Sequence, residues 1–255
     1  MKQKICTIAC IALSASLFLS ACGPDLKVAR QDFRNGDHQS ALEQWTQLSD
    51  FGLPQAQLEL ARAYAQGRVT DRDLHGALSL INSAVSKNDP SQKRLTSQVK
   101  FIAATEFLAH GDSNLQDIGL RYLQESVDTG SPRALFEMAR VYEEGYGQDK
   151  NAEKAASYYT QASDAGYARA TYYHGRMFHR GRIVKKAPKK ALSMYSKALE
   201  EGYKKAALDI GRFHERGLGT PIDLDQAIHY YSIASDNGIQ QATEALNALK
   251  GSHVD

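Results

Sequence analysis

Residues 152–168 read AEKAASYYTQASDAGYA, and the pattern returns as PKKALSMYSKALEEGYK at 188–204 and as LDQAIHYYSIASDNGIQ at 224–240. Each copy begins 36 residues after the one before it. A fixed period of this length is typical of a solenoid, in which each repeat buries its apolar face only against its neighbours. The repetition therefore predicts an all-α solenoid of helix-turn-helix repeats.

Within the first copy, the small and aromatic residues follow a helical spacing. Ala155, Tyr158, Tyr159 and Ala162 fall at i, i+3, i+4 and i+7, which is one face of a helix. Glycine marks two chain reversals in every repeat, since only glycine adopts a left-handed cap without strain. The glycines recur every 36 residues in two series, Gly130, Gly166, Gly202 and Gly238, and Gly145, Gly181 and Gly217.

Alanine recurs in three further series of the same period, and we interpret each as a close contact between helices. The series are Ala134, Ala170, Ala206 and Ala242; Ala155, Ala191 and Ala227; and Ala162, Ala198 and Ala234. The second helix of each repeat is predicted to start at Asn151 and Asp223 as N-caps, with Pro188 as the first helical residue of the repeat between them.

These residues resemble Sel1-like repeats, relatives of tetratricopeptide repeats with a longer loop between the paired helices. The matching motif consists of Ala134 through Tyr142, Gly145-Tyr146-Gly147, Lys154-Ala155 through Tyr159, Ala162 and Gly166-Tyr167. The resemblance implies a right-handed solenoid. The next repeat departs from the motif, with Gly181-Arg182-Ile183 in place of Gly-x-Gly, so we expect a reshaped loop there.

The repeat domain is predicted to span residues 26–250 and to end in a capping helix. Its units are 26–52, 53–88, 89–130, 131–166, 167–202 and 203–238, followed by the capping helix 239–250 and a frayed tail 251–255. Unit 89–130 is six residues longer than the 36-residue units, and we interpret 89–94 as an insertion on its first helix. Trp45 is expected to be a core residue of the opening unit.

The N-terminal segment predicts export from the cytoplasm. Lys2 and Lys4 precede an apolar run that ends near Leu19, too short to anchor the chain across a bilayer, so residues 1–21 are predicted to be a signal peptide. Its end, Leu19-Ser20-Ala21-Cys22, resembles the lipobox of bacterial lipoproteins. That resemblance implies lipidation of Cys22, for example with palmitate, and a short tether at 22–25. An ordinary signal peptide is the alternative.

The residue after Cys22 is Gly23 rather than aspartate, which by the sorting rule of bacterial lipoproteins implies the outer membrane, facing the periplasm. The acyl chains would hold the protein on the bilayer without a transmembrane helix. If Cys22 is the mature N-terminus, no thiol remains in the folded part, so we expect neither a disulfide nor a cysteine metal site.

The sequence contains no pattern typical of an enzyme. There is no nucleophile elbow, no zinc-protease motif and no phosphate-binding loop after a strand. His174 and His179 are five residues apart, about 140° around a helix, which is a poor arrangement for two metal ligands. We therefore predict a protein that is not an enzyme and needs no cofactor or metal, and we expect no nucleic acid among its partners.

Charge is distributed unevenly along the chain. Residues 168–205 contain eleven Lys and Arg but only Glu200 and Glu201 as acids. The positions of the first helix expected to face a groove are Arg169, Tyr172, Tyr173, Arg176, His179 and Arg180. Such a surface suits an anionic polysaccharide or an acidic peptide. A solvated face is the alternative for the charge around Lys185 and Lys190.

One arginine of this candidate groove recurs with the repeat period. The series is Arg62, Arg140, Arg176 and Arg212. Arg140 and Arg212 therefore belong to the candidate groove as well. A ladder of ion pairs is the alternative reading, in which Glu59, Glu137 and Glu143 neutralise these arginines.

A second resemblance concerns the start of the mature chain. Gly36-Asp37, Ala41, Trp45, Leu48 and the stretch to Gln57 are similar to the start of the AlgK family, repeat lipoproteins of alginate secretion. The resemblance implies a scaffold on the periplasmic side of the outer membrane, with an export barrel and periplasmic proteins as partners. The alternative is a periplasmic adaptor that regulates a signalling or envelope-stress protein.

Overall fold

The computed structural model describes residues 24–67, 70–86, 93–181 and 185–252. The predicted signal peptide, Cys22 and the turn at 182–183 lie outside these ranges. All regular secondary structure in the described ranges is helical, in thirteen helices, which confirms the all-α prediction. The chain divides into two compact units, residues 1–99 and 100–255, and each is described by itself.

The first unit contains the two opening helical hairpins. Its helices are α1 (Leu26–Asn35), α2 (His38–Asp50), α3 (Pro54–Gln66) and α4 (Leu74–Ser86). Trp45 on α2 is 1% exposed and packs in a cluster with Ala29, Ala41 and Leu60. Its predicted place in the core is therefore confirmed.

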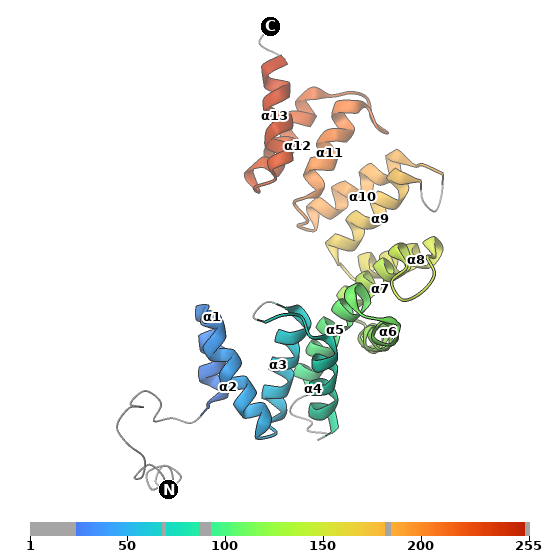
Figure 1. The fold of residues 1–255 in the computed structure, drawn as a ribbon. Helices are drawn as coiled ribbons and strands as arrows, with labels where there is room; N and C mark the ends of the chain where they lie inside the picture. Colours follow the sequence, from blue (N-terminus) through green and yellow to red (C-terminus); the bar gives the residue numbers. More distant parts are fainter. Residues whose placement is uncertain (1–23, 68–69, 87–92, 182–184, 253–255) are drawn as a thin grey trace, which may run out of the picture. The chain divides into compact units, whose positions relative to one another are not determined.

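The second unit contains most of α5, which begins at Lys93 and crosses the division between the units, and all the later helices. In order they are α5 (Lys93–His110), α6 (Ser113–Asp128), α7 (Pro132–Glu144), α8 (Ala152–Asp164), α9 (Ala168–Arg180), α10 (Pro188–Glu200), α11 (Ala206–Arg216), α12 (Leu224–Asp236) and α13 (Gln240–Ser252). Figure 1 shows α7 with α8, α9 with α10 and α11 with α12 as successive hairpins. These hairpins are the predicted repeats.

The helix boundaries follow the predicted capping residues. The Asn151 side chain accepts a hydrogen bond from the backbone N–H of Lys154 at 2.8 Å, and Asp223 caps α12 in the same way. Pro188 is the first residue of α10. Gly145, which ends α7, has a φ of 80°, a left-handed conformation that an L side chain rarely adopts. The predicted role of glycine at the chain reversals is therefore confirmed.

The recurring alanines lie where helices touch. All ten alanines of the three series are fully buried. Contact between paired helices is close at Gly211 on α11 as well, where an added Cβ would lie 2.6 Å from the Tyr231 ring of α12. The small residues therefore set the approach of neighbouring helices, as predicted.

The irregular unit differs from its neighbours in its helices and in the turn between them. Most of its predicted insertion, residues 89–92, lies outside the described residues. Its helices α5 and α6 contain 18 and 16 residues, whereas α7 and α8 contain 13 each. The turn between α5 and α6 is only residues 111–112, whereas residues 145–151 connect α7 to α8. Both helices of this unit are therefore longer than those of the next hairpin, and the unit lacks its long inter-helix loop.

Helix α13 caps the last hairpin. Ala242 is fully buried and Leu246 is 9% exposed, both packed in a cluster with Ala207 and Tyr231. The helix continues to Ser252. The prediction of a capping helix is confirmed, but its end at residue 250 is wrong by two residues.

Candidate functional site

The first helices of the three regular hairpins differ in charge although they occupy the same register. Helix α9, ARATYYHGRMFHR, contains three arginines and no carboxylate. Helix α7, PRALFEMARVYEE, contains two arginines and three glutamates, and α11 contains one aspartate and one glutamate beside its two arginines. The excess of positive charge therefore begins within α9 itself, before the lysines of the loop that follows.

Three of the four recurring arginines pair with a carboxylate on their own helix. Arg140 Nη1 donates to Glu137 Oε2 at 3.0 Å, and Arg212 Nη1 lies 3.4 Å from Asp209 Oδ1. In the first unit, Arg62 pairs with Glu59 in the same i, i+3 relation. The ladder interpretation is therefore correct for these arginines, and Arg140 and Arg212 are not unpaired groove cations.

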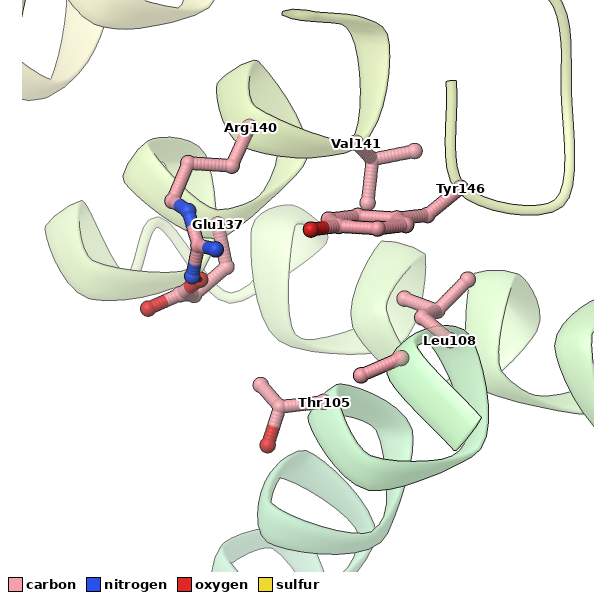
Figure 2. Close-up of a pocket in the computed structure, with 7 residues that line it drawn as sticks. Thr105, Leu108, Glu137, Arg140, Val141 and Tyr146 are labelled. Atoms are coloured by element: carbon pink, nitrogen blue, oxygen red, sulfur yellow. Dashed lines mark hydrogen bonds and ion pairs between the residues drawn. The ribbon is translucent and has the colours of Figure 1, made fainter. Parts of the chain in front are cut away.

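A small cavity lies beside the Arg140 pair. Figure 2 shows Arg140 and Glu137 on one side, and Tyr146, Leu108 and Thr105 around the rest of the opening. The cavity measures about 40 Å³. Sites for small organic ligands are typically about 300–1,000 Å³, so this one has room for water and not for a substrate.

Arg176 is the exception in the series because Tyr173 occupies the position of the carboxylate. The Arg176 guanidinium carbon lies over the Tyr173 ring, 4.7 Å from its centroid. Arg169 lies over the same ring at 5.7 Å and over Phe136 of α7 at 4.8 Å. Among the described residues, no carboxylate forms an ion pair with Arg176. Two cations therefore share one aromatic ring.

Tyr172, predicted to face the groove, is instead an interior residue. It is 6% exposed, and its hydroxyl donates to Asp209 Oδ2 of α11 at 2.6 Å. Burial and the Asp209 carboxylate both raise the pKa of Tyr172, so the phenol stays protonated. Neighbouring positions on a helix point about 100° apart, and the next repeat covers the side on which Tyr172 lies.

His179 likewise points toward the neighbouring helices. Its Nδ1 lies 3.3 Å from the Tyr195 hydroxyl of α10, and its ring meets Phe213 of α11 at 4.8 Å between centroids. Burial lowers the pKa of His179; the Asp209 carboxylate opposes this shift, and the charges of nearby cations add to it. The imidazole is therefore a neutral packing group rather than a groove cation.

The position that His179 occupies in α9 is a glutamate in the flanking hairpins, Glu143 in α7 and Glu215 in α11. Tyr159 donates its hydroxyl hydrogen to Glu143 Oε2 at 2.7 Å, and Tyr231 donates to Glu215 Oε2 at 2.6 Å. Glu143, predicted as a partner in the arginine ladder, is thus a hydrogen-bond acceptor for the second helix. The hairpin of α9 and α10 has replaced two carboxylates of its neighbours, one by Tyr173 and one by His179.

Tyr203, which the sequence analysis did not select, completes the surface. Its ring lies 4.9 Å from that of Tyr172. Burial raises the pKa of Tyr203, while the charges of Arg169 and Arg176 oppose that rise. The 36-residue spacing of Tyr167 and Tyr203 was the available signal. We name Arg169, Tyr173, Arg176 and Tyr203 the basic cluster.

Arg180, the last predicted groove residue, is exposed at the end of α9. No three His, Cys, Asp or Glu side chains of the described residues gather in a way that could hold a metal ion. None of the described helices combines the length and apolar character needed to cross a bilayer.

Family comparison identifies the repeats. The model of the Sel1 repeat matches residues 54–89, 132–167, 168–203 and 204–239, more than half of the chain. The chain belongs to the Sel1 repeat family. Proteins of this family mediate protein–protein interactions, and their repeats are typically non-catalytic. The long-helix unit of α5 and α6 falls between the matched segments.

Solved structures share the fold. A Sel1 repeat protein from Oxalobacter formigenes matches with a TM-score of 0.64 and 20% identity, over 88% of this chain and 89% of that one. The c5321 protective antigen of uropathogenic Escherichia coli matches with a TM-score of 0.52 and 20% identity, over 87% of this chain and 55% of that one. At these identities the likeness shows the fold alone. No curated protein matches the chain.

Proposed function

We propose that this protein is a lipid-anchored scaffold on the periplasmic face of the outer membrane, where it holds together proteins of an exopolysaccharide secretion complex of the alginate type. The observation that carries the proposal is a regular Sel1 array in which one hairpin presents a cluster of cations and aromatic rings. A repeat array provides a wide interaction surface without a catalytic pocket. In this role the chain binds proteins and transforms no substrate.

The sequence outside the described residues supports the location. Leu19-Ser20-Ala21-Cys22 resembles a lipobox, and Gly23 fits retention in the outer membrane. The start of the mature chain resembles the AlgK family, which supports the secretion complex and its export barrel as partners. An anchor at Cys22 would hold the repeats close to a barrel in the same membrane.

Substitution of the anchor tests the proposal in cells. The variant Cys22→Ser should move the protein from the outer-membrane fraction to the soluble periplasm and reduce export of the polymer. The variant Cys6→Ser is the matched control, since Cys6 lies within the predicted signal peptide and should leave both readouts unchanged. Retention of the Cys22→Ser protein in the membrane would contradict the lipid anchor.

The polymer readout separates the two functional classes. If loss of the anchor leaves polymer export intact and instead changes the output of an envelope-stress reporter, the protein is an adaptor for a signalling protein and not a secretion scaffold. If both readouts are unchanged while the protein is released, the scaffold proposal is wrong.

A further inference from the structure

We infer that the basic cluster binds an acidic segment of a partner protein, in which aspartate and glutamate side chains occupy the place that carboxylates of this chain occupy in the neighbouring repeats. This inference rests on the proposed scaffold function, since it gives the chemistry of one of the partners.

The repeats themselves show what the recurring arginine binds. At the positions of Arg140 and Arg212 the partner is a carboxylate three residues earlier, Glu137 or Asp209. At Arg176 that position is Tyr173. A tyrosine covers the flat face of a guanidinium by a cation–π contact but accepts few of its hydrogen bonds. Arg176 is therefore held in place while its N–H edge is available to a carboxylate from outside.

The second cation strengthens the site. Arg169 is held over both Tyr173 and Phe136, so two guanidiniums are fixed against the same ring. Fixed cations lose less side-chain entropy on binding than freely moving ones. Arginine also suits a carboxylate because its N–H groups can form paired hydrogen bonds with both oxygens.

Two carboxylates on neighbouring elements have other partners than Arg176. Asp209 accepts from the Tyr172 hydroxyl and pairs with Arg212. Glu201 accepts from Thr171 at 2.8 Å and lies 3.7 Å from Lys197. Among the described residues, neither acid forms an ion pair with Arg176. The guanidinium of Arg176 can therefore pair with a carboxylate from a partner.

An acidic peptide fits the cluster better than an acidic sugar polymer. Binding of a sugar by stacking needs an open aromatic face. Arg169 and Arg176 both lie over the ring of Tyr173, so an approaching ligand meets guanidinium N–H groups there. Carboxylates on short, flexible side chains can reach these groups without a flat stacking surface. The polymer is accordingly one outcome that the experiment must separate from the peptide.

The experiment measures binding of a fluorescein-labelled peptide of alternating glutamate and serine to the full chain at several salt concentrations. Binding to the unmodified chain should weaken steeply as salt rises, because exposed charges are screened over about 10 Å at 0.1 M. The variant Tyr173→Glu restores the carboxylate found in α7 and should weaken binding at least about tenfold, since Arg176 becomes paired within its own helix.

Three further variants make the result specific. Arg176→Gln should also weaken peptide binding, and it keeps the Tyr173 side chain in place over Arg169. Lys189→Ala changes the net charge by the same one unit as Tyr173→Glu, but at an exposed position on α10. Arg212→Gln removes the arginine of the same register that is already paired. Both of these controls should change affinity less than about twofold.

The inference is overturned if Tyr173→Glu and Arg176→Gln, both with unchanged helical circular dichroism, bind the peptide as the unmodified chain does. It is also overturned if a uronic acid polymer binds at the cluster and the peptide does not. Failure of the Cys22→Ser experiment with intact peptide binding would contradict only the proposed location. Loss of peptide binding with a correct cellular phenotype would contradict only this site.

Discussion

The hairpin of α9 and α10 and the hairpin before it, α7 and α8, share one scaffold and differ in their polar side chains. Arg169 lies over Phe136 at 4.8 Å, and its counterpart Arg133 lies over Phe101 at 4.9 Å. The buried tyrosine of the second helix is fully covered in both. Two of the polar differences on the first helix concern the site, Glu137 against Tyr173 and Glu143 against His179.

The comparison shows how a repeat protein can change a surface while it keeps its hairpin fold and the buried tyrosine of its second helix. Exchange of a glutamate for Tyr173 keeps the arginine ordered but leaves it without a carboxylate in its own helix. Exchange of the second glutamate for His179 keeps a hydrogen-bonding partner for the buried tyrosine but removes its charge. Each repeat contacts only its neighbours, so such changes stay local.

The largest effect is expected where the two hairpins are alike. Tyr159→Ala and Tyr195→Ala should each lower the free energy of unfolding by about 3–5 kcal/mol, because both rings are fully buried. Urea unfolding followed by circular dichroism measures both. Lys189→Ala, at an exposed position, should stay within about 0.5 kcal/mol. If only one of the two variants lowered the free energy of unfolding, the two hairpins would not share one scaffold.

Removal of the hydroxyl alone should distinguish the hairpins. Tyr159→Phe leaves the half-buried Glu143 carboxylate without this donor, and a hydrogen bond to a charged group contributes about 1.5–3 kcal/mol. Tyr195→Phe removes a longer contact with a neutral imidazole, which contributes about 0.5–1.5 kcal/mol. The same urea titration compares the two. Equal losses would contradict the assignment of a charged acceptor in one hairpin and a neutral one in the other.

The smallest effect is a dependence of stability on pH that is specific to α9. Burial lowers the pKa of His174 and of His179, so the unfolded chain binds protons more readily than the folded one. Stability should be complete above the ordinary histidine pKa of about 6.5 and should decline as the pH falls toward the lowered values. The double variant His174→Gln, His179→Gln should flatten this decline in thermal unfolding. An unchanged pH profile would show that other groups cause it.

The sequence was sufficient for the fold because its signals are local and recur. Gly145 and the series of alanines predicted the hairpins, and capping by Asn151 and Asp223 follows from hydrogen bonds within a single turn. The unit of α5 and α6 was less predictable. Its longer helices and its two-residue turn at 111–112 interrupt the 36-residue period, so the register of the neighbouring repeats does not predict them.

The candidate site was predictable only in part. Arg169, Tyr173 and Arg176 share a helix face, so helical spacing brings them together. Tyr172 and His179 were misplaced because their orientation depends on contacts with α10 and α11 that no spacing within α9 reveals. Tyr203 was missed for the same reason, since it belongs to the next repeat in the chain.

The most direct test of the account moves the site from one hairpin to the other. In the Tyr173→Glu background, the added change Glu137→Tyr should free Arg140 beside Arg133 and restore binding of the glutamate–serine peptide, with its steep salt dependence. Recovery of most of the affinity would show that a missing carboxylate in this register creates the site. A double variant that remains helical and binds as weakly as Tyr173→Glu alone would contradict the account.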